Sequence, residues 1–246
     1  MTTPETTTKK LSLVIPAYNE QNTILRTVQE AREFCAEHFA DAEIIVVNDG
    51  STDKTEEILA GQSLARVISY PENRGKGCAV RTGILAAAGD IVCFTDADLA
   101  YGLSPLLRAV PLLAEYDAVV GSRRLSAEGY GEYTPLRKLM SRVFHFMTRV
   151  FSGLKYDSQC GFKCFSREAA RDVFTLTQTD GFAADFEIML LADKLGLRVA
   201  ELPVSIIRHG NSSVSVVRDS LRVFADLRRI RARLKRVAAP EKTPNE

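Results

Sequence analysis

Two aspartates one residue apart, Asp96 and Asp98, stand at the end of the apolar run Asp90–Thr95. Like charges held this close need a cation or a shared proton between them. Hard carboxylate oxygens suit Mg²⁺ or Mn²⁺, which in proteins usually also bind the phosphates of a substrate. The spacing therefore predicts a divalent metal at Asp96 and Asp98. A helix cap beside a solvated Asp is the plainer alternative.

Two further turns carry groups that could bind a nucleotide. Asp49 precedes a glycine, which allows a positive φ, and a serine, which can cap the next helix. Its carboxylate could accept from a nucleobase or a ribose hydroxyl, or simply close an Asx turn. Arg74 and Lys76 alternate with glycines and could approach a diphosphate. Neither turn matches the P-loop or the dinucleotide-binding pattern, which disfavours an ATPase or an NAD enzyme.

These turns follow short apolar runs that alternate with helical patterns. Strands are expected at Leu11–Ile15, Glu43–Val47, Ala65–Ser69, Asp90–Thr95 and Asp117–Val120, and helices at Glu20–Glu37, Asp53–Ala60, Gly77–Ala88 and Ser104–Tyr116. Apolar strands separated by helices predict an α/β fold with a mostly parallel sheet covered on both faces. Ligands of such sheets bind outside the carboxyl ends of the strands, so the polar turns are expected to share one site.

Composition limits the function classes. The chain has 246 residues, of which 46% are hydrophobic and 26% charged, as in a globular protein of one large domain or two small ones. Lys and Arg total 32 and Asp and Glu total 31, so the chain lacks an overall basic footprint for nucleic acid. No apolar stretch reaches the ~18 residues that span a bilayer.

As a set, the motifs resemble those of the inverting nucleotide-sugar glycosyltransferases of the GT-A group, family 2. The residues that carry the resemblance are Ile15–Glu20, Val46–Asp53, Asn73–Gly77, Asp96–Asp98 and Gly121–Arg123. The segment Asp157–Lys163 and the Phe-His-Phe at Phe144–Phe146 look most like the branch of dolichyl-phosphate glucosyltransferases. The resemblance implies a Rossmann-like GT-A domain at residues 11–237, between disordered ends at residues 1–10 and 238–246.

The resemblance also implies a role for individual residues. Asp96 and Asp98 would hold the sugar diphosphate and a Mg²⁺ or Mn²⁺ ion, and Ala97, which lies between them in the sequence, would also contact the donor. Arg123 and Gln159 would line the sugar and acceptor side. The nucleotide-sugar donor would be bound by Pro16, Ala17, Tyr18, Glu20, Asp49 and Lys76. Ala100 stands where mannose synthases carry a Gln, so a metal contact from that position is missing.

The acceptor decides which other groups the reaction needs. Negative charge builds on the leaving nucleoside diphosphate, and a divalent metal would stabilise it. A lipid phosphate is largely ionised near neutral pH and can attack without a general base, whereas a hydroxyl needs one. Arg123, Arg137 and Arg208 are the candidate cations for an acceptor phosphate. Asp185 would be the base for a hydroxyl acceptor, would bind the donor sugar beside a phosphate acceptor, or would only stabilise a helix N-terminus.

Two segments could bring the enzyme to a lipid. Leu136–Phe151 is an amphipathic pattern with basic residues off its apolar stripe, and Arg218–Arg236 combines eight basic residues with a second stripe. A core-facing helix with a solvated basic face explains each pattern without a membrane. With the resemblance, we expect interface helices that place a peripheral enzyme at the cytoplasmic face of a membrane. A homo-oligomer is compatible with the sequence.

The sequence thus predicts transfer of a hexose from a nucleotide donor to polyprenyl phosphate with inversion. UDP-glucose is the first donor expected and GDP-mannose the second. One rival is a glycosyltransferase for a soluble hydroxyl acceptor with Asp185 as base. Another is a non-catalytic nucleotide-binding or membrane-scaffolding module, for which Asp98 would be dispensable.

Overall fold

The computed structural model describes residues 9–126, 153–208 and 216–236, the last segment with side chains from residue 225 onward. The Leu136–Phe151 helix expected from the sequence, the Phe-His-Phe motif and Arg137 lie outside these residues. So do residues 1–8 and 237–246, which include nearly all of the two ends expected to be disordered.

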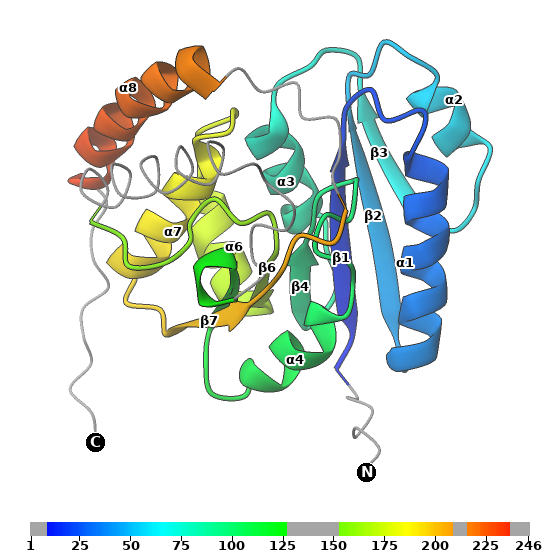
Figure 1. The fold of residues 1–246 in the computed structure, drawn as a ribbon, viewed down its shortest axis with the longest axis horizontal. Helices are drawn as coiled ribbons and strands as arrows, with labels where there is room; N and C mark the ends of the chain where they lie inside the picture. Colours follow the sequence, from blue (N-terminus) through cyan, green and yellow to red (C-terminus); the bar gives the residue numbers. More distant parts are fainter. Residues whose placement is uncertain (1–8, 127–152, 209–215, 237–246) are drawn as a thin grey trace.

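Strands and helices alternate as expected through the first half of the chain (Figure 1). The strands are β1 (Leu11–Ala17), β2 (Ala42–Asp49), β3 (Arg66–Tyr70), β4 (Ile91–Phe94), β5 (Ala118–Ser122), β6 (Lys163–Ser166) and β7 (Val199–Pro203). The helices are α1 (Ile24–His38), α2 (Thr55–Ala60), α3 (Lys76–Leu85), α4 (Pro105–Leu112), a short η1 (Arg123–Leu125), α6 (Arg167–Leu176), α7 (Ala184–Lys194) and α8 (Val216–Leu234).

Helix ends differ from the predicted ones for local reasons. The first helix begins at Ile24 rather than Glu20, and the backbone N–H groups of Glu20 and Gln21 donate to Thr55 at the start of α2 and to Asp53 just before it. The fourth helix follows Ser104, as predicted, but the Ser104 side chain makes no capping hydrogen bond. This helix ends at Leu112, one residue after an internal proline that cannot donate to the helix ladder.

The sheet has seven strands in the order β3-β2-β1-β4-β6-β5-β7. β1 pairs in parallel with β2 and β4, β2 with β3, and β5 with β7, whereas β6 is antiparallel to both β4 and β5. The prediction of a mostly parallel sheet is confirmed. β6 and β7 are additions that the sequence analysis missed.

The antiparallel β6 matters for the site. Its first residue, Lys163, pairs with Phe94 at the end of β4 and with Val120 near the end of β5. The turn that precedes β6 therefore meets the carboxyl ends of β4 and β5 at one edge of the sheet. This topology places the Asp157–Lys163 motif beside the Asp96–Asp98 motif.

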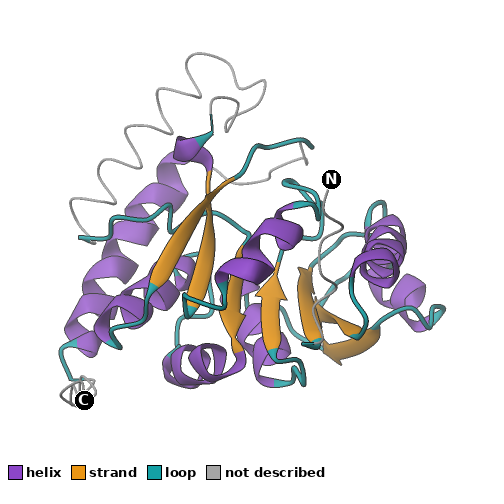
Figure 2. Ribbon diagram, turned by 90° about the horizontal axis from the view of Figure 1, so that it is seen from below, coloured by secondary structure: helices purple, strands orange, loops and turns teal. Residues whose placement is uncertain are grey.

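Helices cover both faces of the sheet (Figures 1 and 2). On one face of the sheet, α1, α2 and α4 pack against strand residues that include Leu13, Ile15 and Val46. On the other face, α3, α6, α7 and the end of α8 pack against strand residues that include Val14, Ile45 and Phe94. Alternate residues of the same strand thus enter opposite cores, which explains why these strands are apolar throughout.

Candidate active site

The polar turns lie at one edge of the sheet, as the sequence predicts. β1, β2, β3 and β4 run parallel, so the turns that follow them meet at their carboxyl ends. β5 is antiparallel to β6, which is itself antiparallel to β4, so β5 ends at this edge too. The site is built from what these ends carry.

Asp96 is held between a cation and a glycine. Its Oδ1 lies 2.6 Å from the Nζ of Lys76, at the first position of α3. Burial alone would raise the pKa of Asp96, but the Lys76 ammonium group outweighs burial and holds this pKa below its ordinary value. On the other side, a Cβ added to Gly161 would meet Asp96 Oδ2 at 1.9 Å. Only glycine at position 161 therefore leaves room for this carboxylate.

Asp98 lies in a tight turn directly after Asp96. Its Oδ1 accepts from the backbone N–H of Ala100 at 3.0 Å. Leu99, between them, has a φ of 48° and a fully buried side chain, an uncommon conformation that the core compensates. Burial, and then the neighbouring Asp96 charge, raise the pKa of Asp98.

A third carboxylate belongs to the same electrostatic group. Burial raises the pKa of Glu20, a hydrogen bond from Thr23 opposes this, and the charges of Asp98 and Asp96 raise it further. Negative charges that destabilise one another are the surroundings a divalent cation would stabilise. No group of three or more His, Cys, Asp and Glu ligands is assembled in the described residues. Asp96 and Asp98 fit a Mg²⁺ or Mn²⁺ ion that takes its other ligands from substrate phosphates and water.

Asp49 is buried at the end of β2 and is held by the glycine-containing turn after β3. Its carboxylate oxygens accept from the backbone N–H groups of Arg74 at 2.8 Å and Gly75 at 2.9 Å, and from the side-chain amide of Asn73 at 3.1 Å. Gly50, with a φ of 64°, lets the two turns touch, since a Cβ there would meet the Glu72 backbone at 2.4 Å. Asp49 therefore fixes the shape of the turn that carries Lys76.

The turn after β1 is joined to the turn after β2. Asn19, at a φ of 56°, accepts through its Oδ1 from the Thr52 N–H at 2.8 Å, and its own N–H donates to Ser51 Oγ at 3.0 Å. Of the predicted nucleoside-binding residues, Tyr18 is exposed, Pro16 is half-buried and Ala17 is buried. Ala97 is also buried, and its carbonyl accepts from Thr27 Oγ1 at 2.5 Å.

Arg123, a candidate cation for an acceptor phosphate, forms an ion pair with Asp157. Its Nε donates to Asp157 Oδ2 at 2.9 Å and its NH2 group donates to Asp157 Oδ1 at 2.8 Å, a bidentate pair that is almost fully buried. This pair joins the end of β5 to the Asp157–Lys163 motif. In the same motif, Gln159 Nε2 is buried without a hydrogen-bond partner in the described residues. A buried amide donor of this kind is costly unless a ligand or water accepts from it.

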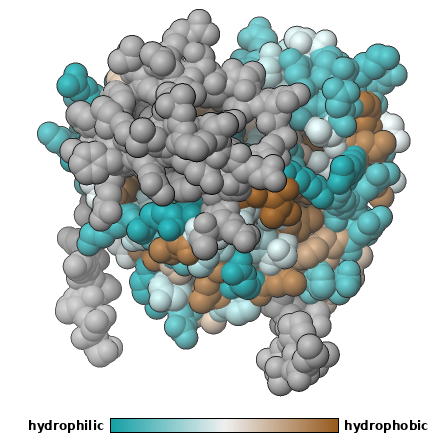
Figure 3. Space-filling view, viewed as in Figure 1, coloured by the Kyte–Doolittle hydropathy of each residue, from teal (hydrophilic) through white to brown (hydrophobic). Residues whose placement is uncertain are grey.

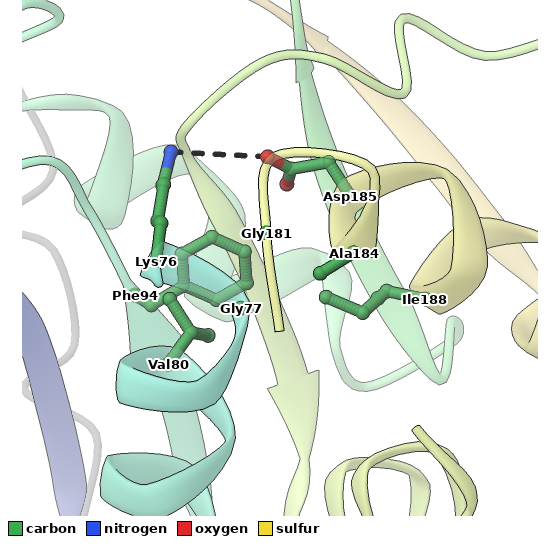
Figure 4. A pocket seen from close by; sticks show the side chains of 8 residues that line it. All are labelled: Lys76, Gly77, Val80, Phe94, Gly181, Ala184, Asp185 and Ile188. Atoms are coloured by element: carbon green, nitrogen blue, oxygen red, sulfur yellow. Dashed lines mark ion pairs between the residues drawn. The ribbon is translucent and has the colours of Figure 1, made fainter. Parts of the chain in front are cut away.

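Asp185 lies in the first turn of α7 between two lysines. Its Oδ2 is 3.8 Å from Lys76 Nζ (Figure 4), and its Oδ1 accepts from Lys163. Lys163 is fully buried and also donates to the Cys160 carbonyl at 2.7 Å. The sequence alone did not indicate a role for Lys163. The feature of the sequence that could have indicated its burial is its position in the Asp157–Lys163 motif, directly before Cys164 and Phe165.

Arg208 lies beside the Asp98 turn, because its backbone N–H donates to the Ala100 carbonyl at 3.3 Å, but its side chain is paired elsewhere. Its guanidinium is 2.8 Å from Glu30 Oε2 on α1, and this hydrogen bond lowers the pKa of Glu30. The structure therefore brings Asp96, Asp98, Lys76 and Asp185 together, with Arg123 joined to their neighbour Asp157, and leaves Arg208 on another ion pair.

Comparison with known proteins identifies the family. The family model for glycosyl transferase family 2 matches residues 12–174. The dolichyl-phosphate β-glucosyltransferase of Saccharomyces cerevisiae is 32% identical over 88% of this chain and 72% of its own length, and the human enzyme is 32% identical over 80% and 67%. Among five such enzymes, the chain spans 64% to 74% of the relative's length.

Solved structures show the same architecture. Glucosyl-3-phosphoglycerate synthase from Mycobacterium tuberculosis, in complex with Mn²⁺, UDP-glucose and phosphoglyceric acid, matches with a TM-score of 0.61 and 25% identity. The match covers 89% of this chain and 80% of that one. The expected GT-A fold is confirmed. With the family model over residues 12–174 and relatives at 32% identity, this chain belongs to glycosyl transferase family 2.

Proposed function

We propose that this enzyme transfers glucose from UDP-glucose to a polyprenyl phosphate and inverts the anomeric centre. The relatives that are dolichyl-phosphate β-glucosyltransferases support the sugar and the lipid, and favour glucose over mannose. The structural neighbour in complex with UDP-glucose and a phosphate-bearing acid supports the donor. The other function carried from the sequence, transfer to a soluble hydroxyl acceptor, is not favoured.

The contacts of Asp185 favour a phosphate acceptor over a hydroxyl acceptor. A hydroxyl acceptor needs a base with an oxygen open to its proton. Both oxygens of Asp185 face ammonium groups, Oδ1 that of Lys163 and Oδ2 that of Lys76. A phosphate acceptor brings its own negative charge and needs no base. Asp185 is then available to position Lys76 or to bind the donor sugar.

Asp96 and Asp98 would hold the Mg²⁺ or Mn²⁺ ion together with the donor diphosphate, and the ion would neutralise the charge that grows on the leaving group. Lys76 would supply a second positive charge beside it. Tyr18, Glu20 and the turn held by Asp49 would bind the nucleoside, and Gln159 would donate to the sugar.

The direct test is a donor panel. Radiolabelled UDP-glucose, UDP-galactose and GDP-mannose are each incubated with the enzyme, polyprenyl phosphate and Mn²⁺, and the lipid extract is counted. We expect label in the lipid from UDP-glucose above the others, and its loss in Asp98→Ala. Absence of lipid-extractable label from every donor would overturn the proposal, and so would equal transfer by the Asp98→Ala variant.

We also propose that the enzyme works peripherally at the cytoplasmic face of a membrane. The described residues contain no helix long and apolar enough to cross a bilayer. On the face shown in Figure 3, hydrophobic residues reach the surface in patches between hydrophilic ones. Leu227, Ile230 and Leu234 of α8 are buried in the core and are not available to a membrane. The support for membrane contact is therefore a group of exposed basic residues, Arg228 and Arg229 on α8 and Lys235 and Arg236 directly after its end.

Liposome flotation tests this contact. The protein should float with vesicles that contain anionic lipid and remain behind with neutral vesicles. Replacing Arg228, Arg229, Lys235 and Arg236 by Glu should abolish flotation, because each basic residue near an anionic surface contributes about 1 kcal/mol. Unchanged flotation of this variant would locate membrane contact elsewhere.

A further inference from the structure

Four charged side chains of alternating sign form a row across the site. Lys76 Nζ lies 2.6 Å from Asp96 Oδ1 and 3.8 Å from Asp185 Oδ2, and Asp185 Oδ1 accepts from Lys163. The four residues come from the turn after β4, the start of α3, the first turn of α7 and the start of β6. Lys76 is thus shared by two carboxylates, one of them a candidate metal ligand.

Lys163 is the fixed cation of the row. Its side chain is fully buried, and its ammonium group donates to Asp185 and to the Cys160 carbonyl. It also lies 5.1 Å from the centre of the Phe94 ring, within range of a cation–π contact. Asp185 therefore keeps one ammonium partner whatever Lys76 does.

The backbone on both sides of Lys76 is fixed as well. Cβ atoms added at Gly75 and Gly77 would each meet a backbone carbonyl of the Thr179–Asp180 segment at 2.5 Å. The Cys78 N–H donates to the Asp180 carbonyl at 3.2 Å. These contacts pack the backbone around Lys76 closely against the Thr179–Asp180 segment, so we assign the rearrangement to the Lys76 side chain.

Space for that rearrangement lies on the Asp185 side. The Lys76 side chain is 21% exposed. A small cavity of about 10 Å³ lies between Lys76, Asp185, Ala184 and Ile188 (Figure 4). This volume, close to the smallest that admits a water molecule, leaves room for the Lys76 side chain to shift. The ammonium group can therefore approach Asp185 without a change in the main chain.

We propose that Lys76 is an exchangeable counter-ion. It neutralises Asp96 while no divalent cation is bound, and it moves toward Asp185 and the donor diphosphate when a cation binds at Asp96 and Asp98. Two positive charges beside one carboxylate repel each other, so a bound cation weakens the contact between Lys76 and Asp96 and favours the move of Lys76 toward Asp185. The displaced ammonium group then meets the diphosphate, so that metal and donor favour each other's binding. This inference deepens the proposed function and rests on it for the identity of the donor.

Binding of Mn²⁺ without donor tests the exchange, measured from the EPR signal of free Mn²⁺. Lys76→Met should bind Mn²⁺ about tenfold more tightly than the wild type, near the lower end of couplings between protein sites. It should also bind UDP more weakly and lose the mutual enhancement of Mn²⁺ and UDP binding. Lys194→Met, at the opposite end of α7 from Asp185, is the control and should bind Mn²⁺ as the wild type does. Unchanged or weaker Mn²⁺ binding by Lys76→Met would overturn the proposal.

A second variant separates exchange from simple charge removal. Asp185→Asn removes the alternative partner of Lys76, so Lys76 should stay on Asp96 and Mn²⁺ should bind more weakly. In the Lys76→Met background the same substitution should leave Mn²⁺ binding unchanged. An equal effect of Asp185→Asn in both backgrounds would contradict the exchange. If Lys76→Met does not fold, Lys76→Gln takes its place in both comparisons.

Neither readout involves lipid or sugar transfer. Failure of the lipid product in the donor panel would therefore overturn the proposed function and leave the Mn²⁺ results standing. Conversely, loss of the predicted Mn²⁺ effects would overturn the role of Lys76 and leave the donor panel standing.

Discussion

Gly161 gives the clearest single-residue consequence of the site geometry. A methyl group at this position would come within 1.9 Å of Asp96 Oδ2 and must displace that carboxylate. Displacements of about 1 Å in an active site can cost about a hundredfold in rate, so we expect Gly161→Ala to lose about that much activity. Initial rates of sugar transfer measure it.

Gly61→Ala is the matched control for this substitution. Gly61 ends α2 with a negative φ, and a Cβ there would make only ordinary contacts at 3.6 Å. It should retain full activity. If Gly161→Ala were as active as this control, the observed position of the Asp96 carboxylate would not be required for sugar transfer.

Asp98 links activity to stability. Its pKa is raised by burial and by Asp96, so the folded state binds its proton more tightly than the unfolded chain does. Stability therefore falls as pH rises from the ordinary pKa of an aspartate to the raised value, and it stays lower at neutral pH. Asp98→Asn removes this cost and should raise Tm by about 2 °C at pH 7 while activity is lost.

Thermal denaturation across pH checks the sign. The Tm advantage of Asp98→Asn should shrink as the pH falls from the raised pKa of Asp98 to the ordinary pKa of an aspartate, and it should be absent below that, where both states of the wild type are protonated. A variant less stable than the wild type at neutral pH would refute the electrostatic argument.

At the scale of elements, the buried Glu187 connects α7 to α8. Glu187 is fully buried and accepts from the N–H groups of Gln178 and Thr179 and from Arg233 of α8. Removing one partner of a buried charge is strongly destabilising, so Arg233→Met should lower the free energy of unfolding by about 3 kcal/mol. Urea denaturation measures this difference.

Arg229→Met is the control on the same helix. Arg229 pairs with Asp226 at 3.5 Å, and its side chain is 82% exposed. Such a surface pair contributes about 0.5 kcal/mol or less. Equal destabilisation by the two substitutions would mean that Glu187 does not depend on Arg233.

The elements also show what the sequence could and could not predict. The first five strands were predicted because each is a β-branched apolar run followed by a polar turn. β6 (Lys163–Ser166) was missed because it begins with a buried lysine rather than an apolar residue. Lysine is depleted in strand cores, and only the three-dimensional partner Asp185 makes its burial tolerable.

At the scale of the whole molecule, the motifs predicted that the polar turns lie at one edge of the sheet, but they did not predict which side chains form ion pairs there. The sequence placed Arg123, Gln159 and Asp185 in one site by resemblance. It could not predict that Asp157 holds Arg123 or that Asp185 is flanked by two lysines, because those partners lie far apart in the chain. The pairs depend on the antiparallel β6, which brings the Asp157–Lys163 segment to the carboxyl edge.

The proposed function depends on an acceptor that is a lipid phosphate rather than a hydroxyl. The initial rate of glucose transfer from UDP-glucose with Mn²⁺ to polyprenyl phosphate, compared with the rate to the polyprenol of the same length, distinguishes the two acceptors. We expect an inverted glucosyl product with the phosphate and none with the alcohol. Transfer to the alcohol at a similar rate, or transfer to neither lipid, would contradict the claim.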